Sequence, residues 1–187
     1  VRGIKRAGID DAFDQESVQR FLEDVFREID ILGNDVPMMQ NRFVSPLSRI
    51  GVDYYEYYLS DTIDVDGVKC IELSFSPFTP ESFGFLGRIY VPLNDSTLFI
   101  KRVKLNVPKS INLNYVESIT MIQDFVKATD GSRLKVRDDM TVEFKIVPGS
   151  QGLYARRTTA YANHNFDAPA DMEVFHNEAK TIVNTDA

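Results

Sequence analysis

The N-terminal quarter of the chain follows a helical hydrophobic period. Apolar residues recur at spacings of three and four after Asp14, with charged residues between them, which predicts an amphipathic helix that ends near Gly33. Its apolar positions are Val18, Phe21, Leu22, Val25, Ile29 and Leu32. The end of this helix is open, because residues 28–35 (EIDILGND) fit an extended conformation as well. Ser45-Pro46 is expected to begin a second, short helical turn, so the helical part covers about 14–50.

From Val52 onward apolar and polar residues alternate, and a period of two is typical of half-buried β-strands. The predicted strands are 52–62, 65–76, 84–92, 97–107, 115–128, 140–148 and 153–166. Turn residues such as Asp66-Gly67 and Asp130-Gly131 separate them, and no interval is long enough for a helical crossover. The pattern therefore predicts an antiparallel meander over about 52–166.

One face of this predicted sheet is apolar, and a single sheet must bury such a face against another element. The predicted fold class is α+β: a long, curved antiparallel sheet, an unclosed barrel of about seven or more strands, with the N-terminal helix packed on its concave face. Residues 1–176 would form this single domain and 177–187 a C-terminal tail. The candidates for the concave face, and for contact with an apolar ligand, are Phe99, Val103, Leu105, Met121, Phe125, Val142, Phe144 and Ile146.

The stretch YYEYYLSDT (54–62) holds four tyrosines in five positions. On a strand they divide between the two faces, so we predict half-buried packing rather than a continuous stacking platform. Tyrosine is also common at protein interfaces, which makes Tyr55 and Tyr57 candidates for contact with a partner.

Composition narrows the class of protein. The 187 residues are 43% hydrophobic and 26% charged, as in one ordinary globular domain, and no stretch reaches the ~18 apolar residues of a membrane helix. The net charge of −7 disfavours nucleic acid as a partner. Cys70 is the only cysteine and lies in an apolar run, so we expect it to be a packing residue.

No catalytic motif is present. Asp64, Asp66 and Gly67 do not have the register of a calcium loop and are better explained as a hairpin turn. The adjacent pair Asp138-Asp139 is assigned to a solvated turn. The two histidines are too few and too far apart to suggest a metal site. We therefore predict no catalytic residue, cofactor or metal, with a hydrolytic enzyme whose site is dispersed along the sequence as a remote alternative.

Several sequence segments, taken in their order along the chain, resemble those of a family of uncharacterised outer-membrane proteins of Bacteroidetes. They are AGIDDAFD, RFVSPLSRIGVDYYEYYLSDT, KCIELSFSPFTPESFGFLGRIYV, STLFIKRVKLNVPKSINLNYVE and TAYANHNF. The resemblance implies a periplasmic domain that follows a carboxypeptidase-regulatory-like domain and precedes a C-terminal outer-membrane β-barrel, and it carries over no catalytic residue. The strand order is also similar to that of periplasmic lipoprotein carriers, which hold acyl chains in an unclosed barrel.

The resemblance suggests two non-catalytic roles on the periplasmic side of the outer membrane. The first is binding of a lipid, an acylated protein or another apolar ligand in the concave face, unless the helix fills that face completely. The second is a structural adaptor that docks on its own β-barrel or on a partner protein. Proteins of this lineage are also often O-glycosylated at Asp-Ser or Asp-Thr followed by a small or apolar residue, which makes Ser96, and less so Thr62, candidate acceptors.

Overall fold

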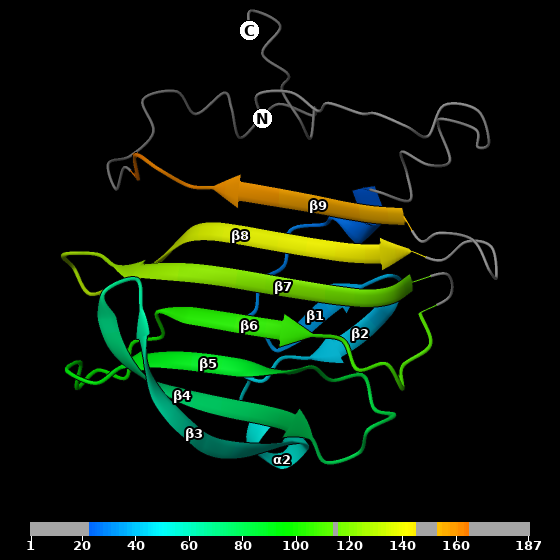
Figure 1. Cartoon of the computed structure of the whole chain (residues 1–187), viewed down its shortest axis with the longest axis horizontal. Helices are drawn as coiled ribbons and strands as arrows, with labels where there is room; N and C mark the ends of the chain where they lie inside the picture. The colour runs from blue at the N-terminus through cyan, green and yellow to red at the C-terminus, as the bar shows by residue number, and fades with distance from the viewer. Residues whose placement is uncertain (1–22, 114–115, 145–152, 165–187) are drawn as a thin grey trace, which may run out of the picture. The chain divides into compact units, whose positions relative to one another are not determined.

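A computed structural model describes residues 23–113, 116–144 and 153–164. Residues Glu23–Ala162 form one compact unit, whose main feature is a seven-stranded sheet in the order β3-β4-β5-β6-β7-β8-β9 (Figure 1). The strands are β3 (Tyr55–Val65), β4 (Val68–Pro77), β5 (Leu86–Pro92), β6 (Arg102–Asn106), β7 (Val116–Lys127), β8 (Arg133–Phe144) and β9 (Leu153–Ala160). Each strand pairs antiparallel with the next in the chain, and β3 and β9 lie at the ends of an unclosed sheet. The predicted antiparallel meander is confirmed.

Two turns explain where strands begin. Asp66 and Gly67 connect β3 to β4 with positive φ angles of 52° and 79°, as a tight hairpin requires. Gly131, with φ of 84°, lies in the turn between β7 and β8. Because β8 starts directly after this turn, at Arg133, it begins earlier than the predicted strand 140–148 and includes Asp138-Asp139.

The prediction of a helical part over 14–50 is wrong for most of its described portion. Residues 14–22 lie outside the described residues, and the helix seen at residues 23–25 stops there. The Asp30 carboxylate then accepts a hydrogen bond from the Leu32 amide at 2.9 Å, a local contact that competes with helical bonding. The chain next forms a hairpin of β1 (Asp35–Met38) and β2 (Asn41–Val44), and a single helical turn, α2 (Gly51–Tyr54), replaces the predicted start of the first strand.

The sheet has two different faces. Register places Leu105, Met121 and Met140 side by side across β6, β7 and β8, and all three are buried. We call this side the inner face; β1 and β2 lie behind the sheet in Figure 1. The opposite, outer face carries polar residues such as Arg102 and Thr120.

One glycine permits the close approach of β5 to its neighbours. A Cβ atom on Gly87 would lie 2.1 Å from the carbonyl oxygen of Lys104 in β6 and 2.6 Å from the ring of Phe75 in β4. Both distances are shorter than any real carbon contact, so no other residue fits without a shift of backbone.

Candidate functional site

The inner face gathers almost all the predicted ligand-contact residues. Six of them lie in three strands and are buried: Val103, Leu105, Met121, Phe125, Val142 and Phe144. Phe99 is buried too, but it precedes β6 in a loop rather than lying in a strand. Ile146 lies outside the described residues. The prediction of one dry face is correct, whereas contact of these residues with a ligand stays a prediction.

The inner face is covered by residues 23–50, which we call the strap. Its buried side chains include Val25, Ile29, Ile31, Val36, Met38 and Phe43. Phe43 stacks on Phe85 at 4.9 Å between ring centroids, and the Val44 amide donates to the Phe83 carbonyl at 2.9 Å. The cover is therefore a loop and hairpin that pack as part of the core, in place of the predicted helix.

Polar side chains of the sheet hold the backbone of the strap. Gln123 is 1% exposed, and its Nε2 donates to the Ile29 carbonyl at 2.9 Å. Arg157 donates to the Phe26 carbonyl through Nη1 and to the Asp138 carboxylate through Nη2, the latter at 3.2 Å. The strap is thus attached by one buried hydrogen bond, from Gln123, and by partly buried ones from Arg157; a hydrogen bond shielded from water has more effect than one on the surface.

An ion pair continues this attachment toward solvent. The Lys135 ammonium contacts the Glu28 carboxylate at 2.8 Å, and the Tyr161 hydroxyl donates to the same carboxylate at 3.2 Å. These contacts lower the pKa of Glu28, mainly through the hydrogen bond from Lys135.

The assignment of Asp138-Asp139 to a solvated turn is wrong. Both residues lie within β8 and are buried, with their side chains on opposite faces. Burial raises the pKa of Asp138 on the inner face above its ordinary value, although Arg157 opposes this. On the outer face, hydrogen bonds from Arg156 first, and from Arg137, hold the pKa of Asp139 well below its usual range. Each carboxylate has a cationic partner, as expected for a structural charge.

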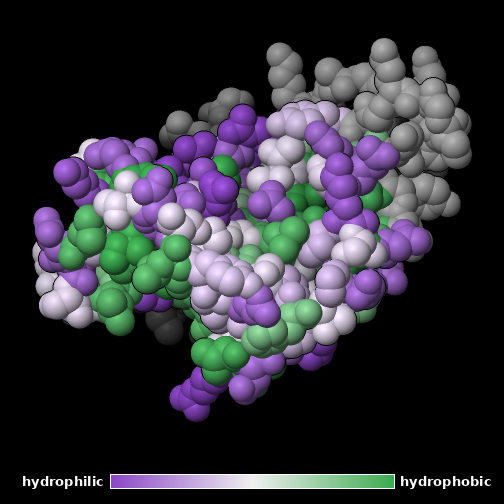
Figure 2. Space-filling model, turned by 60° about the horizontal axis from the view of Figure 1, so that its bottom comes forward, coloured by the Kyte–Doolittle hydropathy of each residue, from purple (hydrophilic) through white to green (hydrophobic). Residues whose placement is uncertain are grey.

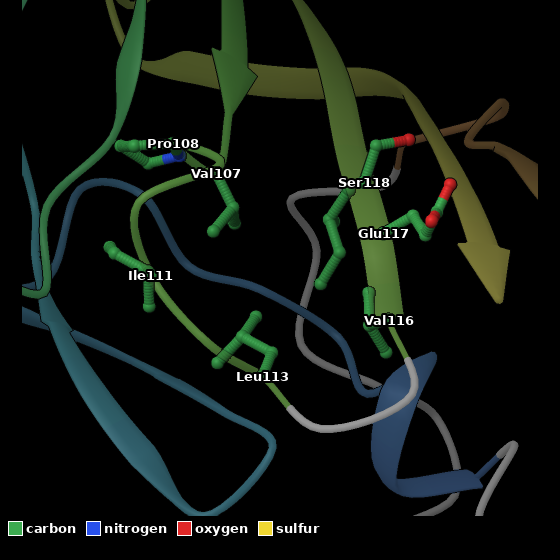
Figure 3. A pocket seen from close by; sticks show the side chains of 8 residues that line it. Val107, Pro108, Ile111, Leu113, Val116, Glu117 and Ser118 are labelled. Atoms are coloured by element: carbon green, nitrogen blue, oxygen red, sulfur yellow. The ribbon is translucent and has the colours of Figure 1, made fainter. Parts of the chain in front are cut away.

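Two cavities adjoin this core. The first has a volume of about 10 Å³, room for one water molecule. Figure 3 shows that Val107 and Leu113 point toward each other and that the Glu117 carboxylate points away. The second measures about 290 Å³ and is lined by strap residues Asp24, Arg27, Pro37, Met38, Met39, Gln40, Asn41 and Arg42. Neither is lined by a predicted ligand-contact residue, so neither is the expected apolar pocket.

Tyr55 and Tyr57 are not exposed in the way an interface anchor requires. Tyr55 is 1% exposed, donates to the Val44 carbonyl at 2.5 Å, and accepts from the Phe85 amide at 3.0 Å. Tyr57 is partly buried and donates to the Pro46 carbonyl at 2.7 Å. The predicted packing role is confirmed for Tyr55, whose burial leaves no exposed surface for contact with a partner.

The exposed apolar side chains of β3 are those of Tyr58 and Leu59, the two residues that follow Tyr57. Tyr58 is 51% exposed and Leu59 is 78% exposed. Figure 2 shows the hydrophobic groups of one side of the molecule in separate patches bordered by hydrophilic ones. Sequence reasoning missed these two residues because alternation assigns Tyr58 and Leu59 to opposite faces but does not show how far each is exposed.

The remaining candidates lie on or near the surface, apart from Cys70. Ser96 is exposed in the loop before β6, and Thr62 is exposed within β3, so both are accessible, while glycosylation at either stays a prediction. Cys70 is fully buried beside Val65 and Tyr90, as predicted for a packing residue. Within the described ranges no three His, Cys, Asp or Glu side chains gather as metal ligands, and no helix is long and apolar enough to cross a membrane.

Comparison with known proteins gives one match. No curated protein and no solved structure was found to match the chain. A family model described as a family of unknown function (DUF5686) matches residues 3–161, which include all seven strands of the sheet. The chain therefore belongs to this family of unknown function.

Proposed function

We propose that this domain is a non-catalytic docking module on the periplasmic side of an outer-membrane protein, which binds its own C-terminal β-barrel or a partner protein. One observation carries the proposal: the inner face is filled by the strap, while the edge strand β3 presents Tyr58 and Leu59 to solvent. Exposed aromatic and aliphatic side chains on a rigid strand are suited to contact a protein surface. The location and the barrel rest on the family resemblance of the sequence.

Site-specific photo-crosslinking in the full-length protein, in its native host, tests this role. A photoreactive amino acid at Leu59 should form a discrete adduct with a partner or with the barrel of the same chain. The matched control position is Val126, an exposed aliphatic residue near the end of β7. Adducts at Val126 equal to those at Leu59, or no adduct at Leu59, would contradict docking through β3.

Binding of an apolar ligand is the second candidate, and one observation favours it. The cover of the inner face is a single continuous segment, so its displacement would uncover the predicted contact residues together. Mass spectrometry of the purified domain after organic extraction should then find a lipid, and a fluorescent fatty acid should be taken up. Loosening the strap with Gln123→Leu should increase that uptake. No lipid and no uptake by either form would exclude this role.

A hydrolytic enzyme is the remote third class. Such a site needs a titratable group beside an open cleft. Asp138 is a buried carboxylate, yet it is paired with Arg157 inside a filled core. Its surroundings support a structural role better than acid-base chemistry.

A further inference from the structure

We infer that the free edge of β3 binds a basic, extended segment of a partner protein, which adds to the sheet as a further strand. This inference rests on the proposed docking role and names the chemical class of the partner. Three features of β3 carry it: an open backbone edge, uncompensated negative charge, and exposed apolar side chains.

The backbone edge is the first feature. β3 is 11 residues long and pairs with β4 on one side. Among the described residues, its backbone forms hydrogen bonds to no other strand. Such an edge presents unpaired amide and carbonyl groups, the groups that bind an added strand in β-augmentation.

Charge is the second feature, and it selects the partner. No lysine or arginine occurs between Arg49 and Lys69. Five acidic residues lie in this interval: Asp53, Glu56, Asp61, Asp64 and Asp66. Asp66 pairs with Arg102 at 2.8 Å, whereas Glu56, Asp61 and Asp64 are exposed and have no ion pair within the part of the chain that the structure describes. In the ladder with β4, Glu56 and Asp61 lie on one face of β3, and Asp64 lies on the other face, opposite Lys69. A strand with lysine or arginine at alternate positions would complement the carboxylates of Glu56 and Asp61.

The same charge argues against a second copy of this chain as the occupant. Pairing β3 with another β3 would bring two acidic strands together, and like charges placed opposite each other destabilise a strand pair.

A β-bulge limits the length of an added strand. The ladder of β3 with β4 shifts register between Leu59 and Asp61, where the Ser60 and Ser74 hydroxyls lie 2.5 Å apart. This bulge bends the strand, so an added segment would be short.

The apolar side chains are the third feature. Tyr58 and Leu59 are adjacent, so on a strand they project to opposite faces. An added strand therefore finds an exposed apolar neighbour on each face, which favours a partner with aliphatic or aromatic residues between its basic ones.

An NMR titration of the 187-residue chain tests the inference directly. The probe is a ten-residue peptide of alternating lysine and valine with capped ends, at low salt, and a glutamate-valine peptide of equal length is its control. The lysine peptide should shift the backbone amide signals of residues 56–64, and added salt should weaken its binding. Shifts centred outside β3, or equal shifts with the glutamate peptide, would overturn the inference.

A charge-reversed variant sharpens this test. Glu56→Lys combined with Asp61→Lys should weaken binding of the lysine peptide at least about tenfold, because attraction becomes repulsion at two positions. Glu81→Lys, at an exposed acid outside the sheet, is the matched control and should leave binding unchanged. Unchanged affinity in the double variant, with its amide spectrum still that of the folded sheet, would overturn the inference.

The two proposals fail in different ways. If the photo-crosslink at Leu59 persists in the double variant at its original yield, β3 docks a partner without regard to charge, and only the basic class of partner is wrong. If no adduct forms at Leu59, the docking role itself is wrong.

Discussion

Gln123→Leu should loosen the strap. In the native chain the Gln123 amide reaches from β7 to the buried carbonyl of Ile29. Leucine has a similar size and fills the same space, but it cannot donate a hydrogen bond. The Ile29 carbonyl would therefore remain buried without its partner, and the strap would be held less firmly against the inner face.

The expected loss follows from the burial of both groups. Leaving a buried carbonyl without a donor costs about 1–3 kcal/mol. For a chain of this length, each 1 kcal/mol lowers the melting temperature by about 2–4 °C. We therefore expect the free energy of unfolding to fall by about 2 kcal/mol and the melting temperature by about 4–8 °C.

Two measurements on the purified chain test this expectation. Urea unfolding followed by circular dichroism gives the free energy of unfolding, and hydrogen exchange reports on local opening. Amides of residues 26–32 should exchange faster in the variant. Thr120→Val is the matched control, because Thr120 lies in the same strand on the outer face and makes an exposed hydrogen bond to Asn106 at 2.9 Å. Its effect should be below about 0.5 kcal/mol.

The reasoning would be refuted in either of two ways. The free energy of unfolding could change no more in Gln123→Leu than in Thr120→Val. Alternatively, exchange could quicken equally over the whole sheet and the strap, which would mean that Gln123 stabilises the core as a whole rather than attaching the strap.

Three further substitutions test the fold at other points. Gly87→Ala should cost about 3 kcal/mol in urea unfolding, because its Cβ would lie 2.1 Å from the Lys104 carbonyl oxygen; a neutral effect would show that β5 can move. Tyr55→Phe should cost about 1–3 kcal/mol, because a buried hydroxyl that both donates and accepts is lost. The pKa of Asp139 is held below its ordinary value of 3.8, so its ionised carboxylate stabilises the fold above that pH, and this stability is lost progressively as the pH falls below it. Urea titrations from pH 7 to pH 3 should therefore show a steeper decline for the native chain than for Asp139→Asn.

The sheet was predictable because its signals are local. Alternation identifies a strand from its own residues, and a pair such as Asp66-Gly67 identifies the hairpin turn without reference to the rest of the chain. Seven strands in chain order then leave few arrangements other than a meander. The inner face was predictable for the same reason, since residues such as Leu105 and Val142 lie between polar neighbours.

The strap was not predictable because its structure depends on distant contacts. Val25 and Ile29 have helical spacing and are both buried, yet they pack on the sheet from a segment that is mostly not helical. The hairpin that follows turns at Met39 and Gln40, with φ angles of 48° and 64°, and neither residue is typical of such a turn. Tertiary packing therefore decides the conformation here.

The buried charges were missed for a related reason. Asp138-Asp139 look solvated when only nearby residues are considered. Their partners, Arg157 and Arg156, come from the neighbouring strand. The register places Arg157 opposite Met140 and Arg156 opposite Thr141, so each arginine lies diagonally across from the aspartate on its own face. An Asp-Asp pair and an Arg-Arg pair in consecutive strands was a signal available in the sequence, but the predicted strand began at residue 140 and left the aspartates out.

The two non-catalytic roles, binding of an apolar ligand and docking of a protein, differ in energetic cost because the inner face is closed. A ligand could reach the predicted contact residues only after the strap leaves, which would expose at least Val36, Met38 and Phe43. Three buried apolar side chains at about 1.5–3 kcal/mol each make this opening cost roughly 5–9 kcal/mol. An unfavourable equilibrium of about 5.5 kcal/mol already lowers apparent affinity about 10⁴-fold. Docking at β3 requires no such opening, because its edge, charges and apolar side chains are presented by the closed form, and for this reason we propose a protein partner in preference to an apolar ligand.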